Sequence, residues 1–296
     1  MDKSSTNITQ ITYDNSIQYK RITSVNKRSV VVKEDQLIIE EPLEIKIAIN
    51  HNRSKKIHDL SVTMRTPGDD FHLVKGFLYT EGIISSEHDI IKMNYTDTLS
   101  GKQGNSILVH LSHHIMFRPE EMQRHFYTTS SCGVCGKTSI DMVKQQSPYL
   151  MDLNDSAVER STLHTMLRRF SESQPLFSQT GGNHAAAAFD AYGTILHTAE
   201  DVGRHNAFDK LIGYLVSQKK IPLRSGCVMV SGRASFELVQ KSWMAGIPLF
   251  AAIGAPSSLA VELASDTGIT LIGFLSHERM NIYTYPDRIK TDISIE

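Results

Sequence analysis

Towards the end of the chain, predicted strands alternate with predicted helices, and this pattern constrains the fold more than any other feature. The apolar runs 227–231, 248–253 and 269–274 predict short buried strands, and segments 235–245 and 259–267 between them have the apolar spacing of helices. Two strands joined through a helix lie parallel in one sheet, and the right-handed crossover packs the helix on the sheet. The sequence therefore predicts a three-layer α/β unit with parallel central strands.

The first part of the chain has a different pattern. Residues 1–28 are polar with weak apolar periodicity, which predicts a mobile tail. Residues 29–125 contain several β-branched, strand-like runs and one helix-like segment, which begins after 67–70 with an aspartate available as its N-cap. We therefore expect a smaller α+β domain over residues 29–125 and a larger α/β domain over residues 126–296.

Composition excludes several classes of protein. The chain has 296 residues, of which 40% are hydrophobic and 21% are charged, which is ordinary for a globular protein with a sizeable core. A net charge of −1 gives no sign of nucleic-acid or membrane binding, and no apolar stretch is long enough to span a membrane. With three cysteines and no apolar secretory segment at the N-terminus, we expect a cytoplasmic protein.

Two of the three cysteines, Cys132 and Cys135, lie two residues apart and are the clearest sign of chemistry. A disulfide between them would constrain very little chain. A four-thiolate zinc site lacks partners, because Cys227 lies in an apolar run typical of a buried thiol, so we expect no metal. Lys137 and the helix-like segment that follows favour a lowered thiol pKa. The pattern therefore favours a reactive pair, either redox-active or sulfur-carrying.

Two loops that follow predicted parallel strands have small residues and hydroxyls suited to an anion. They are 231–235, with Ser231, Gly232 and Arg233, and 254–258, with Ser257. Ligands of open α/β sheets gather at the carboxyl ends of the strands, where the N–H groups of helix N-termini can meet a phosphate. Either loop alone is more typical of an ordinary helix cap, whereas the two together are equally compatible with a nucleotide-like or otherwise phosphorylated ligand. Neither loop has the lysine of a Walker motif.

Few of the 13 histidines carry information. His184 and His205 are in segments that we expect near the carboxyl ends of the strands, where each is either a ligand contact or a structural histidine. His205 belongs to the polar segment 200–206, which opens another predicted helix. His113 and His114 follow a predicted strand and are more typical of a surface.

Four motifs occur together in a fixed order along the chain. They are Ser131-Cys132-Gly133-Val134-Cys135-Gly136-Lys137, Glu200-Asp201-Val202-Gly203-Arg204-His205-Asn206-Ala207-Phe208-Asp209-Lys210, Ser231-Gly232-Arg233 and Gly254-Ala255-Pro256-Ser257-Ser258-Leu259-Ala260. This set resembles the formate dehydrogenase accessory protein family (FdhD), sulfur carriers for the sulfuration of the molybdenum cofactor. The resemblance runs from about residue 36 to about residue 288, and the second motif is the most specific.

The resemblance implies a sulfurtransferase of the sulfur-carrier type. In such proteins a cysteine desulfurase delivers sulfane sulfur to the cysteine pair as a persulfide, and the carrier passes it to bis-molybdopterin guanine dinucleotide for formate dehydrogenase. Here the persulfide would form on Cys132, with Cys135 as the relay or resolving thiol. The resemblance also implies a cytidine-deaminase-like fold for the larger domain and a homodimer.

The resemblance implies a cofactor-binding stretch directly after the last predicted strand. This stretch comprises Phe274, Leu275, Ser276, His277, Glu278 and Arg279. Arg279 and His277 are chemically suited to phosphate or guanine. Together with Ser231, Gly232, Arg233, Ser257 and His205, these residues form the predicted binding site for the dinucleotide client.

Three other functions compete with sulfur transfer. A zinc deaminase requires His-x-Glu upstream of Pro-Cys-x-x-Cys, whereas Ser131 precedes Cys132 here and the nearest acidic-histidine pattern, 197–200, is downstream and wrongly spaced. A thiol-disulfide oxidoreductase would have its pair after a first strand of a thioredoxin-like order. A third alternative is a cofactor-binding chaperone that transfers no sulfur.

Overall fold

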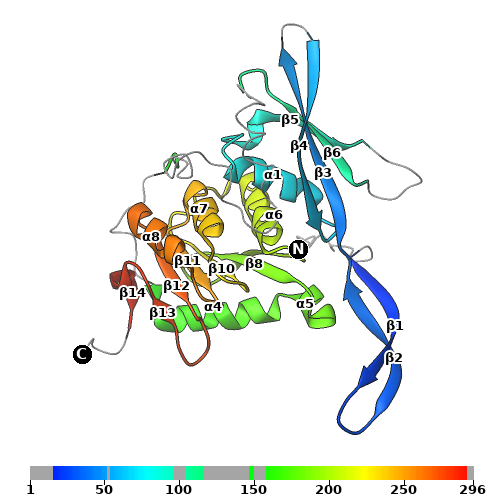
Figure 1. Ribbon diagram of the computed structural model, residues 1–296. Coiled ribbons are helices and arrows are strands. Elements are labelled where there is room, and N and C mark those ends of the chain that lie inside the picture. Colours follow the sequence, from blue (N-terminus) through cyan, green and yellow to red (C-terminus); the bar gives the residue numbers. More distant parts are fainter. Residues whose placement is uncertain (1–15, 52–53, 97–103, 116–146, 150–157, 292–296) are drawn as a thin grey trace, which may run out of the picture.

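The computed structural model describes residues 16–51, 54–96, 104–115, 147–149 and 158–291 (Figure 1). A six-stranded sheet forms the centre of the C-terminal part, in the order β13-β12-β11-β10-β8-β9. Its strands are β8 (His184–Phe189), β9 (Ile195–Asp201), β10 (Cys227–Val230), β11 (Leu249–Ala252), β12 (Thr270–Gly273) and β13 (Asn281–Ile282). Strands β10, β11 and β12 are mutually parallel, which confirms the prediction from the strand–helix alternation.

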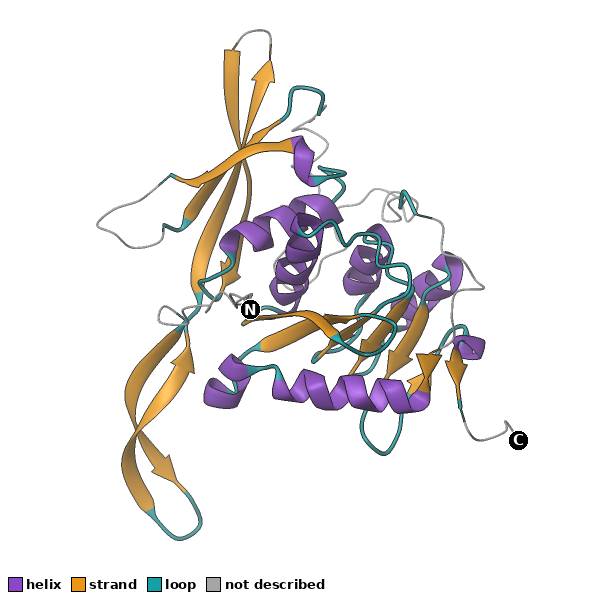
Figure 2. Cartoon of the chain, turned by 180° about the vertical axis from the view of Figure 1, so that it is seen from behind, coloured by secondary structure: helices purple, strands orange, loops and turns teal. Residues whose placement is uncertain are grey.

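Helices cover both faces of this sheet (Figures 1 and 2). The helices are α4 (Arg160–Glu172), α5 (Pro175–Thr180), α6 (Arg204–Ser217), α7 (Phe236–Met244) and α8 (Ser258–Thr267). Alternate residues of the buried strands separate the two faces. Cys227 and Met229 of β10 pack in a cluster with α4, whereas Val228 and Val230 pack in a cluster with α6, α7 and α8. The mixed α/β architecture therefore has the sheet between two layers of helices.

The N-terminal part contains a four-stranded sheet, in the order β4-β3-β6-β5, and one long helix. The elements are β3 (Glu41–His51), β4 (Ser54–Arg65), α1 (Asp70–Thr80), the 3-10 helix η2 (Glu87–Asp89), β5 (Ile90–Tyr95) and β6 (Ser106–Leu111). The prediction that an aspartate caps α1 is wrong. Asp69 occupies the N-cap with a left-handed φ of 55° and makes no capping hydrogen bond through its side chain. The carboxylate of Asp70 instead accepts two hydrogen bonds from the buried Arg65 guanidinium, at 3.0 and 2.9 Å.

Helices α1 and α6 cross with their backbones in contact. A Cβ atom at Gly76 of α1 would lie 1.8 Å from the carbonyl oxygen of Asp209, and one at Gly213 of α6 would lie 1.9 Å from that of His72. Only glycine fits either position, because any side chain would overlap the opposing backbone. One apolar cluster therefore continues from the N-terminal sheet through α1 and α6 to the six-stranded sheet.

A two-stranded hairpin projects from the body and is called the arm below (Figure 1, dark blue). It consists of β1 (Ile17–Val25) and β2 (Val30–Ile38), paired antiparallel along their whole length. The expectation of a tail through residue 28 therefore does not hold for β1. Among the polar residues of β1 are the β-branched Thr23 and Val25, which lie opposite Val32 and Val30 of β2 and favour a strand. Several of the arm's apolar side chains are exposed, namely Tyr19, Val25, Val30, Val31, Val32 and Leu37.

Two short elements complete the described chain. β7 (Val158–Glu159) pairs in parallel with β14 (Ile289–Lys290), which follows the 3-10 helix η3 (Pro286–Arg288). This pairing holds the C-terminal segment beside the beginning of α4. Among the described residues, no helix has the length and apolar character needed to cross a membrane.

Candidate functional site

The two loops predicted to bind an anion lie side by side at one edge of the six-stranded sheet. Gly254 N–H donates to the carbonyl of Gly232 at 3.0 Å, and Ser257 N–H donates to that of Ala234 at 3.0 Å. These bonds extend the parallel pairing of β10 and β11 beyond the strands. We call this edge, formed by the ends of β10, β11 and β12 and the beginning of β8, the carboxyl edge.

Gly254 permits this close approach of the two loops. A Cβ atom at this position would lie 2.9 Å from the carbonyl oxygen of Gly232 and 3.0 Å from Cα of Arg233. A larger residue would separate the loops and the helix N-termini that follow them. Arg233 is exposed beside this contact. The hydroxyl of Ser257 accepts a hydrogen bond from Ala260 N–H at 3.2 Å, so Ser257 is the N-cap of α8.

The stretch that follows β12 joins the same edge. Phe274 N–H donates to the carbonyl of Gly254 at 3.1 Å, with Phe274 in a left-handed conformation (φ 51°). Leu275 is 1% exposed and packs in the core on the α4 side of the sheet. The Ser276 hydroxyl closes a turn by accepting the N–H groups of Glu278 and Arg279. The side chains of His277, Glu278 and Arg279 are exposed. The Arg279 guanidinium lies 5.3 Å from the centre of the Phe274 ring.

Two histidines lie next to these loops, at the place expected for them. His184 begins β8, and its Nδ1 is 3.5 Å from the Ser231 hydroxyl. His205 lies in the first turn of α6, with Nε2 3.4 Å from the Ser235 hydroxyl at the N-cap of α7. Burial is the main cause that lowers the pKa of both histidines, and the positive charge of the neighbouring Arg204 is the second. The pKa of His184 is lowered, and that of His205 is lowered to about 4. Both imidazoles are therefore neutral near pH 7.

The residues of the polar segment that contains His205 have two different roles: some are buried and connect parts of the fold, and others lie at the carboxyl edge. Asp201 is fully buried, where it pairs with Lys210 Nζ at 2.8 Å and accepts the N–H of Thr66 at 3.1 Å. Asn206 donates to the carbonyl of Met64 at 2.7 Å. These side chains connect the end of β4 to the six-stranded sheet. Arg204 and His205, in contrast, lie next to loop 231–235, where a Cβ atom at Gly232 would be 3.7 Å from Cδ of Arg204 and His205 faces Ser235.

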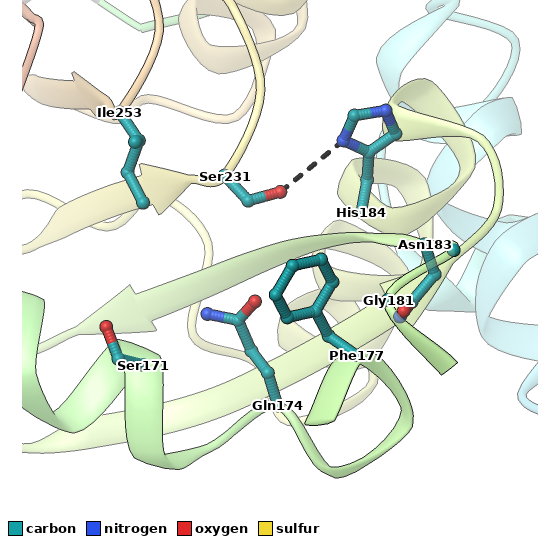
Figure 3. Close-up of a pocket in the computed structure, with 9 residues that line it drawn as sticks. Ser171, Gln174, Phe177, Gly181, Asn183, His184, Ser231 and Ile253 are labelled. Atoms are coloured by element: carbon teal, nitrogen blue, oxygen red, sulfur yellow. Dashed lines mark hydrogen bonds between the residues drawn. The ribbon is translucent and has the colours of Figure 1, made fainter. Parts of the chain in front are cut away.

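A cavity of about 530 Å³ opens on the α4–α5 side of the carboxyl edge (Figure 3). It is lined by Ser171, Gln174, Phe177, Gly181, Gly182, Asn183, His184, Ser231 and Ile253. Phe177 and Gln174 rise from the helical wall toward Ser231 and Ile253 on the opposite wall (Figure 3). The predicted site residue Ser231 therefore lines this cavity, together with His184.

The sequence-based site prediction omitted most residues of the cavity. Phe177, Gln174, Asn183 and Ile253 come from three separate segments with no common motif. In the sequence, only Asn183 and Ile253 have a feature that could have indicated the cavity, because each lies next to the end of a predicted strand. This feature is a weak indication, since the strand order must be known before the two ends can be placed at one edge.

The predicted catalytic pair, Cys132 and Cys135, lies outside the described residues. Cys227 is a free thiol buried in β10, and burial raises its pKa, so it is unreactive. Within the described ranges, no group of three or more histidine, cysteine or acidic side chains is arranged to hold a metal ion.

Comparison with known proteins places the chain among relatives of similar length. The model of the FdhD/NarQ family matches residues 38–290. The protein named sulfur carrier protein FdhD of Mycolicibacterium paratuberculosis is 46% identical over 273 residues, covering 91% of this chain and 97% of the relative. The protein of the same name from Saccharolobus solfataricus is 39% identical over 277 residues, covering 92% and 99% of the two chains.

A solved structure has the same fold. The crystal structure from Desulfotalea psychrophila, described as that of a candidate formate dehydrogenase accessory protein, matches with a TM-score of 0.68 and 22% identity. The match covers 93% of this chain and 100% of that one. Because the family model spans most of the sequence and the relatives align over nearly their whole length, this chain belongs to the FdhD/NarQ family.

Proposed function

We propose that this protein is a sulfur carrier in the maturation of formate dehydrogenase, which takes persulfide sulfur from a cysteine desulfurase and transfers it to bis-molybdopterin guanine dinucleotide. The observation that carries the proposal is the name sulfur carrier protein FdhD, shared by relatives that are 39–46% identical over 91–92% of the chain. The closely spaced Cys132 and Cys135 supply thiols suited to that role.

The cysteine pair can carry out the transfer with a balanced exchange of electrons. The Cys132 thiolate attacks the terminal sulfur of the donor persulfide, so that a new S–S bond forms on Cys132 and the donor leaves as a thiolate. Attack by Cys135 on the inner sulfur of Cys132 then forms a disulfide and releases the terminal sulfur as sulfide toward the client. The two electrons come from the pair, and a dithiol reductant restores it for the next cycle.

The carboxyl edge is the proposed binding surface for the client. Loops 231–235, 254–258 and 274–279 are held together there by backbone hydrogen bonds, next to the N-termini of three helices. Backbone N–H groups at these N-termini and the exposed Arg233 and Arg279 are suited to the phosphates of a dinucleotide. His205 and Ser257 are proposed contacts at the same edge.

Four further features belong to the proposal. The larger α/β unit is cytidine-deaminase-like in its arrangement, and the protein is a homodimer. It works in the cytoplasm, where thiols remain reduced. Its partners are a cysteine desulfurase and formate dehydrogenase.

Mass spectrometry after incubation with a cysteine desulfurase and cysteine tests the carrier function. We expect a gain of about 32 Da on the peptide containing Cys132, corresponding to one added sulfur. The gain should be absent in Cys132→Ala and present in Cys135→Ala, which lacks the resolving thiol. Cys227→Ala is the matched control, because this buried thiol should not affect the gain.

Absence of an adduct on Cys132 in Cys135→Ala, where no resolving thiol can discharge the persulfide, would contradict sulfur carriage. If the protein still bound the dinucleotide client, it would be a cofactor-binding chaperone. If it instead reduced insulin disulfides, it would be a thiol-disulfide oxidoreductase.

A further inference from the structure

The arm is a two-stranded ribbon that extends away from the rest of the described chain (Figures 1 and 2). Near its tip, Val25 and Val30 are 71% and 68% exposed. At its base, Ile38 packs against Gly182, directly after α5. A two-stranded hairpin by itself is only marginally stable in water, because it buries little apolar surface. The arm therefore gains stability from a surface that covers it.

The exposed apolar side chains of the arm gather on one face of the ribbon. In an antiparallel pair, residues directly opposite each other share a face, and successive residues of a strand alternate between the two faces. Val25 lies opposite Val30. Thr23 lies opposite Val32, and Tyr19 is on the same face, closer to the base. All five side chains are exposed, and we call the face that they form the apolar face of the arm.

Hydrogen bonds hold the tip of the arm in one conformation. Asn26 Oδ1 accepts the N–H groups of Arg28 and Ser29 at 2.8 and 2.9 Å, and Asn26 N–H donates to the carbonyl of Ser29 at 3.0 Å. The pairing of β1 with β2 is unbroken up to this turn. A partner would therefore meet a preformed face, which lowers the entropy cost of binding.

The arm and the rest of the chain have net charges of opposite sign. Five basic and two acidic side chains give the arm a charge of +3, and the whole chain has −1, so the rest of the chain has −4. The seven charged residues are Lys20, Arg21, Lys27, Arg28, Lys33, Glu34 and Asp35. Glu34 lies opposite Arg21, and Asp35 lies opposite Lys20, so the excess positive charge is near the tip. Opposite net charges favour contact between the arm of one copy and the rest of another.

The size of the apolar face indicates how many arms a stable interface requires. Nine residue pairs make a ribbon about 30 Å long and about 10 Å wide. One arm seated on another surface therefore buries about 600 Å² in total, which is below the roughly 1,200 Å² of a specific, stable interface. Two arms exchanged between two copies bury about twice as much and reach that value. The area therefore favours a second copy over a partner that receives only one arm.

From these observations we propose that the arm is a dimerisation element, and that the apolar face of each arm lies against the body of a second copy of this chain. The body is the part of the chain outside the arm. The two copies exchange their arms reciprocally about a two-fold axis. The inference rests on the homodimer of the proposed function and assigns the surface that holds its two copies together.

Sedimentation equilibrium of the full chain over a range of concentrations measures the Kd of the dimer. Val32→Lys is the test variant and Val31→Lys the matched control, because these neighbours are 52% and 51% exposed but point to opposite faces. We expect Val32→Lys to weaken the dimer at least about tenfold, since it places an unpaired charge in the interface, and Val31→Lys to change its Kd less than about twofold. Equal weakening by the two would overturn the assignment of the face. An unchanged Kd in Val32→Lys would overturn the proposal.

Charge reversal at the tip distinguishes contact with the body from contact between two arms. Lys27→Glu/Arg28→Glu changes the charge of the arm from +3 to −1, so it should weaken the attraction to a body of charge −4. The difference from the wild type should shrink as the salt concentration rises from about 0.05 to about 0.5 M, because salt screens exposed charges. Stronger association of the variant would show that two positive arms meet each other, and would overturn contact with the body.

Other occupants of the apolar face would give different results. A wild type that stays monomeric at every concentration would overturn the proposal. If Val32→Lys then bound the cysteine desulfurase more weakly than Val31→Lys does, the face would belong to that partner instead. Thermal unfolding of each variant, followed by circular dichroism, verifies that the body is folded.

The persulfide measurement separates failure of this inference from failure of sulfur carriage. It is made on Cys132 in the Cys135→Ala variant, with the expected gain of about 32 Da. If the persulfide forms but Val32→Lys leaves the dimer intact, the assignment of the arm fails and sulfur carriage stands. If Val32→Lys dissociates the dimer but no persulfide forms, sulfur carriage fails and the assignment of the arm stands.

Discussion

A buried ion pair connects three helices and allows a quantitative test of the core. Lys241 of α7 has its Nζ 2.9 Å from both carboxylate oxygens of Asp209 in α6. The same Nζ donates to the Thr80 hydroxyl at 2.8 Å and lies 3.2 Å from Glu81 at the end of α1. Both members of the pair are more than nine-tenths buried. Replacing Lys241 with methionine would leave the Asp209 carboxylate buried without its cation.

The expected loss follows from the depth of burial. Removing one partner of a buried pair destabilises a protein by about 3–5 kcal/mol, because the remaining charge stays desolvated. For a chain of this size, that corresponds to a fall in Tm of roughly 6–20 °C. The double variant Lys241→Met/Asp209→Leu removes both charges and should return to within about 1 kcal/mol of the wild type or exceed it.

Urea unfolding followed by circular dichroism measures these differences in the free energy of unfolding. Lys290→Met is the matched control, because Lys290 pairs with Glu159 at 3.5 Å on the surface and should contribute less than about 1 kcal/mol. A loss below about 1 kcal/mol in Lys241→Met would refute the reasoning. A double variant as unstable as the sum of the two single variants would also refute it, since the charges would then not be coupled.

Two further predictions concern pH and helix packing. Burial lowers the pKa of His197, stacked 3.7 Å from Tyr214, to about 4. Because the unfolded chain then binds the proton more tightly, stability should fall as the pH drops from about 6.5 to 4, by up to roughly 3 kcal/mol. His197→Phe should reduce the slope of this part of the urea-midpoint profile without removing it, because the pKa of His205 is also lowered to about 4. An unchanged slope would contradict the assignment. Gly213→Ala should destabilise the protein by about 3 kcal/mol or more, because its methyl group would overlap the carbonyl of His72. A urea midpoint equal to that of the wild type would show that α1 and α6 can separate freely.

The sequence predicted the parts of the fold that depend on local pattern. The short apolar runs around Cys227, Leu249 and Thr270 alternate with helical spacing, and parallel pairing follows from that alternation. Because the carboxyl ends of parallel strands share an edge, the loops at Gly232 and Gly254 were expected to lie near each other, and their backbones are hydrogen-bonded.

Features that depend on long-range contacts could not be predicted. The cavity combines Phe177, Asn183 and Ile253, which no sequence spacing relates. The roles within the segment that contains Asp201 and His205 also depend on contacts with the end of β4 and with Thr66 directly after it, more than 130 positions earlier. For this reason a polar motif that looks uniform in sequence separates into buried connecting residues and residues at the carboxyl edge.

The projecting arm affects how the size of the molecule should be measured. A slender extension adds little mass but increases frictional drag, so the Stokes radius should exceed that of a compact body of 33.1 kDa. Figure 2 shows how far β1 and β2 extend from the remaining chain. A single copy would elute early in gel filtration and could be mistaken for two. The proposed homodimer is therefore better tested by sedimentation equilibrium or light scattering, which report mass independently of shape.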